Sequence, residues 1–109
     1  MQINFINKTE AILGNNMTNS DKIIALCDIL IPKVMYIPLP QAPIIELKVL
    51  KFQSNFQSKS QIYFIAQTLI ALLQYRTSNF NNAIKLVKEI HENISDEILM
   101  EYKASSCVI

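Results

Sequence analysis

Residues 72–87 read LLQYRTSNFNNAIKLV and place two apolar stretches with helical spacing on either side of a turn. The four residues TSNF between them include short polar residues, which favour turns and helix N-caps. Apolar residues recur with a helical period upstream, back to a cap at Ser58 or Ser60, and downstream, after a cap at Asn79. The sequence therefore predicts an antiparallel helix pair over residues 60–94. The side chains expected inside it are Ile62, Ile65, Ala66, Leu69, Ile70, Leu72, Leu73, Phe80, Ala83, Ile84, Val87, Ile90 and Ile94.

The rest of the chain also favours helices. Its single glycine, Gly14, leaves few positions for the left-handed turns that β-hairpins need. A first helix from about Ile3 is expected to end at Gly14 in a left-handed cap, and the next to start with Ser20 as N-cap and Asp21 in its first turn. The predicted fold is all-α, with five or six helices in one domain, residues 1–109. Helices are expected near residues 20–31, 44–54, 60–76, 80–93 and 96–104.

All four prolines lie in residues 32–43, PKVMYIPLPQAP. Pro32 should stop the preceding helix, because a residue before proline disfavours the α conformation. Pro43 suits the start of the next helix, whose apolar residues are Ile44, Leu47, Leu50 and Phe52. The segment is expected to be non-helical, an extended crossover between helices. Its apolar side chains either cover the core as a lid or line a groove for a partner.

Charge and hydrophobicity restrict the class of partner. The 10 Lys and Arg and 9 Asp and Glu give a net charge of +1, and the basic residues are scattered along the chain. Binding to a phosphate backbone needs a concentrated basic surface, so no nucleic-acid partner is expected. Half of the residues are hydrophobic and 17% are charged. A small domain of this composition does not easily enclose every large apolar side chain, which favours a protein partner or a homodimer.

The cysteines and the hydropathy favour a cytoplasmic protein. Cys27 and Cys107 are far apart and form neither a disulfide framework nor a zinc spacing. The first residues lack the pattern of a secretory signal, and Ser106 stands where a prenylation signal needs cysteine. The longest nearly uncharged helical run, residues 62–75, is shorter than the roughly 20 residues that span a bilayer. We therefore expect no membrane span and a reducing compartment.

Candidate chemistry is sparse. His91 is the one histidine, and the positions three and four residues later hold Ile94 and Ser95, which are not metal ligands. Cys27 could meet His91 only through the fold, and it lies on an apolar helix face where cysteine usually acts as a small hydrophobe. One glycine cannot build a phosphate-binding loop. The sequence therefore predicts no enzyme activity, no cofactor and no metal.

Residues 64–97 resemble one tetratricopeptide repeat of 34 residues. Ile70 and Ala71 match the family's large-small pair, Phe80 its aromatic residue, and Ala83 the small residue where the two helices cross. Val87 stands at a further aromatic position of the family. The departures from the pattern are Gln67 for tryptophan, Gln74 for tyrosine, Ser78 for glycine, Ile90 for a small residue and Ser95 for proline.

In size and helicity the chain is similar to the small repeat-fold chaperones of type III secretion needle subunits. It also resembles the repeat region of the scaffold subunits of the anaphase-promoting complex. Bacteriocin immunity proteins are a third look-alike, as helical bundles of this size. The first resemblance implies a chaperone that holds a partner helix, the second a fragment of a repeat scaffold, and the third a protein that neutralises a toxin.

The function expected is therefore a non-enzymatic protein–protein interaction module, a small chaperone or adaptor that sequesters an apolar helix or peptide of a partner. In this reading the first helix of the pair presents a concave face, turned away from the second helix, and the proline segment closes its edge. The expected partner-binding residues are Met35, Tyr36, Leu39, Tyr63, Gln67, Gln74 and Tyr75.

Overall fold

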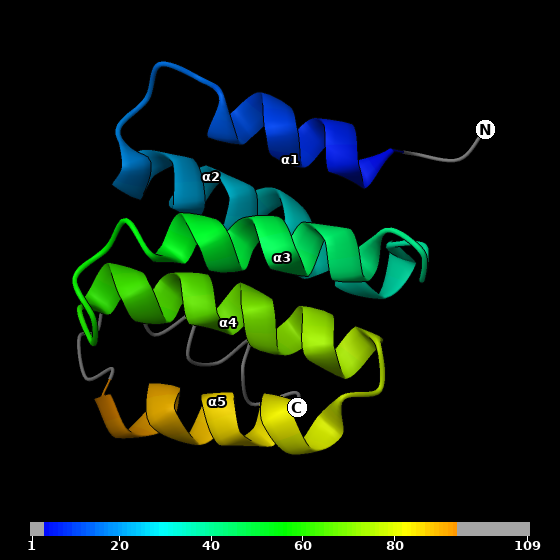
Figure 1. Cartoon of the computed structure of the whole chain (residues 1–109), viewed down its shortest axis with the longest axis vertical. Helices are drawn as coiled ribbons and strands as arrows, with labels where there is room; N and C mark the ends of the chain where they lie inside the picture. The colour runs from blue at the N-terminus through cyan, green and yellow to red at the C-terminus, as the bar shows by residue number, and fades with distance from the viewer. Residues whose placement is uncertain (1–3, 94–109) are drawn as a thin grey trace.

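The computed structural model describes residues 4–93, which form five α-helices and one 3₁₀-helix and contain no strand. The all-α prediction is thus confirmed, while Ile94 and the helix expected over 96–104 lie outside the described residues. The elements are α1 (Phe5–Leu13), α2 (Asn19–Leu30), η1 (Ile31–Tyr36), α3 (Ala42–Gln53), α4 (Gln61–Arg76) and α5 (Phe80–Asn93). Successive α-helices run antiparallel, as the colour gradient in Figure 1 shows.

Three helices begin at a side-chain cap. Asn4, Thr18 and Ser60 each accept a hydrogen bond from the backbone N–H three residues later. Ser60 is one of the two caps predicted for this helix, Ser58 being the other. The prediction of Ser20 as the cap of α2 was wrong, because Thr18 takes that role with its hydroxyl 3.1 Å from the amide nitrogen of Asp21. Asp21 does lie in the first turn of α2, where its charge favours the positive end of the helix dipole.

The first part of the proline segment, up to Tyr36, is a 3₁₀-helix, and its last two residues already belong to α3, which corrects the prediction of an extended, non-helical crossover. Helix α2 ends at Leu30, just before Pro32, as predicted, but Ile31 keeps helical dihedrals (φ −58°, ψ −48°) and the chain continues directly into η1. The reason is positional: at the start of η1 the N–H that proline lacks would have no helical partner. Val34 and Ile37 are buried, and Arg76 Nε donates to the Ile37 carbonyl at 3.1 Å.

Gly14 does not form a left-handed cap, so that prediction was also wrong. Its φ is −89° and its ψ is 0°, and its N–H donates to the Glu10 carbonyl at 2.9 Å. The left-handed positions are instead Lys59 (φ 64°) and Ser78 (φ 67°), which precede and follow α4. Ser78 therefore adopts the conformation for which glycine is preferred, in the turn that reverses the chain between α4 and α5.

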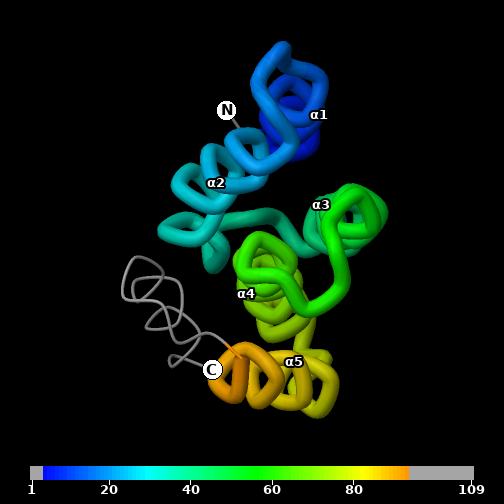
Figure 2. Tube along the Cα trace, turned by 90° about the vertical axis from the view of Figure 1, so that its left-hand side faces the viewer, coloured from blue at the N-terminus to red at the C-terminus, as the bar shows by residue number. Residues whose placement is uncertain are grey.

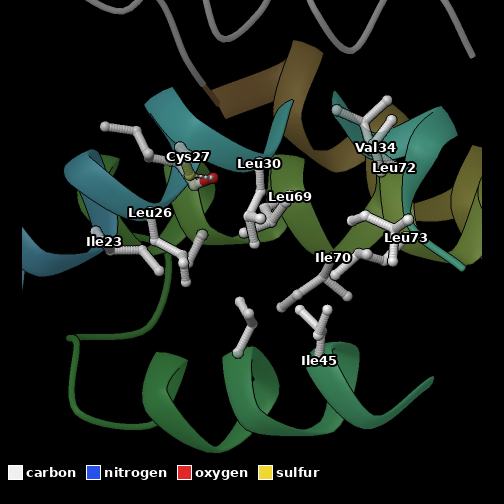
Figure 3. Packing of buried hydrophobic residues seen from close by; sticks show 14 of the residues in the cluster. Ile23, Leu26, Cys27, Leu30, Val34, Ile45, Leu69, Ile70, Leu72 and Leu73 are labelled. Carbon is white, nitrogen blue, oxygen red and sulfur yellow. Dashed lines mark hydrogen bonds between the residues drawn. The ribbon is translucent and has the colours of Figure 1, made fainter. Parts of the chain in front are cut away.

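Helix α4 lies at the centre of the molecule. It contacts α2, η1, α3 and α5, and in Figure 2 it is surrounded by α2, α3 and α5. Every residue from Phe64 to Gln74 is buried. Figure 3 shows Ile70 of α4 pointing toward Ile45 of α3, and Leu69 lying beside Leu30 of α2. A helix that is buried on all sides needs no single apolar face, which explains the long apolar run around residues 62–75.

The apolar residues of α3 divide between core and surface, and the predicted inner face of α5 was partly wrong. In α3 the enclosed side consists of Ala42, Ile45, Val49 and Gln53, whereas Ile44, Leu47 and Leu50 are exposed. Helix α3 has apolar residues on two sides, and its packing on α4 buries only one of them. In α5 the side with Ala83 and Ile90 is buried against α4, while Phe80 and Ile84 on the neighbouring side are exposed.

Candidate protein-binding surface

Three of the expected partner-binding residues lie at the surface, on and after η1. Met35, Tyr36 and Leu39 are 57%, 78% and 54% exposed. Their neighbours Val34 and Ile37 are buried, so the side chains along η1 and just after it point partly to the core and partly to the surface. The inward side chains anchor η1 to the core, and the outward ones are free to contact another molecule.

Two other expected residues, Gln67 and Gln74, do not lie on a free surface. Gln67 Nε2 donates to the Leu86 carbonyl at 3.0 Å and to Glu89 Oε2 at 3.3 Å, so it faces α5 rather than turning away from it. Gln74 Nε2 donates to Glu46 Oε2 of α3 at 3.3 Å. Both side chains are buried. Gln67 therefore does not lie on the side of α4 that is turned away from α5, and neither glutamine is exposed to a partner in this structure.

The last two expected residues, Tyr63 and Tyr75, are half-buried near the two ends of α4. The Tyr63 ring meets Phe64 edge-on, with ring centroids 5.5 Å apart, and its carbonyl accepts from Gln53 Nε2 at 3.0 Å. The Tyr75 ring meets Phe80 at 5.2 Å, across the turn between α4 and α5. These contacts give both tyrosines a role in packing the ends of α4.

The outer side of α3 carries three of the four apolar residues that the sequence singled out in this helix. Ile44, Leu47 and Leu50 are 46%, 54% and 45% exposed, and their spacing of three residues puts them along one side of the helix. We call these three residues the α3 stripe. One sequence feature could have indicated that this stripe is exposed. A second apolar series, at positions 42, 45 and 49, has an equally good helical period and competes for the buried side.

An open groove of about 480 Å³ runs beside the α3 stripe, between the C-terminal parts of α1 and α3. Half-buried Leu13 and Phe52 supply its apolar floor. Lys48 Nζ lies 2.9 Å from Glu10 Oε1 and bridges the two helices. The residues that line this α1–α3 groove are Glu10, Leu13, Gly14, Lys48, Lys51, Phe52 and Asn55.

Cys27 is the reactive group of greatest interest on sequence grounds, and it is enclosed in the core. Its Sγ donates to the Ile65 carbonyl at 3.7 Å. Burial raises the pKa of the Cys27 thiol, and the charge of Asp28 raises it further. The thiolate is the nucleophilic form, so this environment does not activate Cys27. Within residues 4–93 no group of three or more His, Cys, Asp or Glu side chains is arranged to hold a metal ion.

No helix in the described part of the chain combines the length and hydropathy needed to cross a membrane. The longest, α4, has 16 residues. Its apolar side chains are directed to the protein core, so its hydrophobicity is explained by its central position.

No family model, curated protein or solved structure matches this chain.

Proposed function

We propose that the protein is a non-enzymatic interaction module that binds an apolar helix or peptide of a partner protein, as a cytoplasmic chaperone or adaptor. One observation carries the proposal. Of the ten large apolar side chains exposed among the described residues, six lie between residues 35 and 50. We call them the 35–50 surface: Met35, Tyr36, Leu39, Ile44, Leu47 and Leu50.

The 35–50 surface is separate from what holds the fold together. The same stretch of chain supplies Ile37, Ala42, Ile45 and Val49 to the core, and each of these is fully buried. Exposed apolar area costs roughly 25 cal/mol per Å², and contact with a partner would remove that cost. Clusters of exposed apolar side chains commonly mark interaction sites.

The residue types fit recognition of a helix. Tyrosine is a frequent contributor to interface energy, and methionine adapts to irregular apolar surfaces. The α3 stripe offers three apolar side chains along one helix. They form a ridge that can pack into a groove on the surface of a second helix laid beside it. Partner helices recognised in this way present apolar anchors at positions i, i+3, i+4 and i+7.

The repeat-like nature of the α4–α5 pair is part of the proposal. Ser78 has the left-handed conformation at the position where tetratricopeptide repeats carry glycine, and Ala83 is buried at the helix crossing. These two features support the resemblance. The site of binding differs from a repeat groove, because we assign it to η1 and α3.

A matched pair of variants tests the proposal. Leu47→Ser alters the 35–50 surface, and Ile84→Ser alters a similarly exposed side chain of α5. The protein would be isolated from its native host with its partner, the partner identified by mass spectrometry, and binding then measured by calorimetry with both proteins purified.

We expect Leu47→Ser to weaken binding at least tenfold and Ile84→Ser to leave it within about twofold, with unchanged helix content in both. Tyr36→Ala should cost about 1–2 kcal/mol of binding free energy. Equal effects of the two serine variants, or full binding by Leu47→Ser, would remove the 35–50 surface as the site.

A further inference from the structure

The charged residues of α3 are distributed unevenly around the α3 stripe. Helix α3 has three of them: Glu46, Lys48 and Lys51. The Glu46 carboxylate accepts a hydrogen bond from Gln74 of α4, which turns it away from the outer side of the helix. Lys48 and Lys51 both line the α1–α3 groove and therefore stand on the side of the stripe that faces α1. This edge of the stripe is basic.

The two lysines differ in how far they are neutralised. Lys48 is paired with Glu10 at 2.9 Å. Within the described part of the chain no ion pair engages Lys51, which is exposed four residues after Leu47 and so lies next to it on the helix surface. A molecule seated on the α3 stripe would therefore meet one uncompensated positive charge at its edge.

A second copy of this chain is a poor match for that edge. The exposed side of α3 offers no carboxylate to a symmetric copy, because Glu46 faces α4 and Glu10 is already paired with Lys48. Two stripes packed together would bury apolar area, but Glu10, the carboxylate at their shared edge, is already paired with Lys48, so Lys51 of each copy would gain no partner there. Like charges placed together across an interface disfavour association.

We propose that the occupant of the α3 stripe is an amphipathic helix of a different protein, with Asp or Glu along the edge that faces Lys51. The inference rests on the proposed function and adds the charge pattern of the partner. The apolar anchors of that helix contact Ile44, Leu47 and Leu50, and its acidic edge lies over the α1–α3 groove. Complementary charge at an interface edge chiefly sets specificity and association rate, and salt screens it.

Three synthetic peptides of about 18 residues test the charge pattern. They share leucine anchors at helical spacing and differ only in the flanking residues, which are Glu, Gln or Lys. Binding to the full chain is followed by fluorescence anisotropy at low and high salt. The proteins compared are the parent, Lys51→Glu, the equally charged control Lys85→Glu on the exposed polar side of α5, and Leu47→Ser.

We expect the Glu peptide to bind on the order of three- to tenfold more tightly than the Lys peptide at low salt, with the ratio falling toward one at high salt. Lys51→Glu should abolish or invert the preference, and Lys85→Glu should preserve it. Equal affinities that depend on Leu47 would overturn the acidic partner while leaving the proposed function intact. If none of the three peptides shows saturable binding, the acidic helix is overturned as the occupant. If the native partner binds Leu47→Ser as tightly as the parent protein, the proposed function is overturned separately. Self-association that Leu47→Ser abolishes would identify a second copy as the occupant and refute the proposal.

Discussion

Ile44 and Ile45 are consecutive isoleucines in α3, and only one of them belongs to the core. Ile45 is 0% exposed and Ile44 is 46% exposed. Replacing each in turn by alanine removes the same atoms from the same helix. Both changes improve helix propensity by the same few tenths of a kcal/mol, so this contribution cancels in the comparison. The pair therefore measures burial alone and decides which side of α3 faces inward.

The expected difference follows from that burial. Truncating a fully buried isoleucine to alanine costs about 2–5 kcal/mol, because the lost transfer free energy adds to the cost of the cavity. Ile45 points toward Ile70 of α4, so the cavity would open beside a buried side chain of the central helix. Full burial of an isoleucine is worth about 1.5–3 kcal/mol, so the half-exposed Ile44 should lose at most about 1 kcal/mol.

Urea unfolding followed by far-ultraviolet circular dichroism gives both free energies. With a slope of about 1–3 kcal/mol per molar urea, Ile45→Ala should lower the midpoint by roughly 1 M or more relative to Ile44→Ala. The slopes themselves should agree, which shows that both variants unfold from the same compact state. Equal losses, or a larger loss for Ile44→Ala, would mean that α3 is rotated about its axis. The α3 stripe would then be core.

Three further predictions concern single side chains of the core and the turns. Burial and the charge of Asp28 raise the pKa of the Cys27 thiol, so at alkaline pH the thiol ionises only in the unfolded protein. The free energy of unfolding should therefore fall above about pH 9 by up to about 1.4 kcal/mol per pH unit. Cys27→Ala should lack this contribution, and identical pH dependence of the two proteins between pH 8.5 and 10.5 would refute it. Ser78→Gly should relieve the left-handed strain and stabilise the protein by about 0.5–1 kcal/mol, raising Tm by several degrees, and an unchanged or lower Tm would contradict this. Gln67→Ala should cost about 1–3 kcal/mol of unfolding free energy, because it removes the two hydrogen bonds that join this side chain to α5. Gln57→Ala, at an exposed position, should cost little, and similar losses for the two variants would count against the hydrogen bonds.

The α4–α5 pair was predictable because its signals are local. Ser60 is a good N-cap, the apolar period continues without interruption to Arg76, and the short polar residues before Phe80 make a turn. These features act within a few residues of each other, so they can be read before any tertiary contact is known. The predicted ends of α4 accordingly agree with the structure, and its N-cap is one of the two serines expected.

The orientation of α3 was not predictable in the same way. Both Ile44 and Ile45 fit a helical apolar series, and the choice between the two sides is made by the packing of Ile45 against α4. The prediction of an extended proline segment was wrong for a related reason. Pro32 excludes an interior helical position but not the start of a 3₁₀-helix, and burial of Val34 and Ile37 selects that conformation. Tertiary contacts override local preference in both places.

The position of α4 also bears on where the proposed binding site lies. If α4 were the inner helix of a repeat array, one side of it would remain open for a partner. Instead the buried run from Phe64 to Gln74 is covered by neighbouring elements, and Gln67 and Gln74 use their amides to join α4 to α5 and to α3. Side chains enclosed in this way cannot contact a partner unless the helices separate. Because separating them would expose the core, a partner that binds the intact fold has to use the outer elements, and there the exposed apolar side chains are most concentrated along η1 and α3.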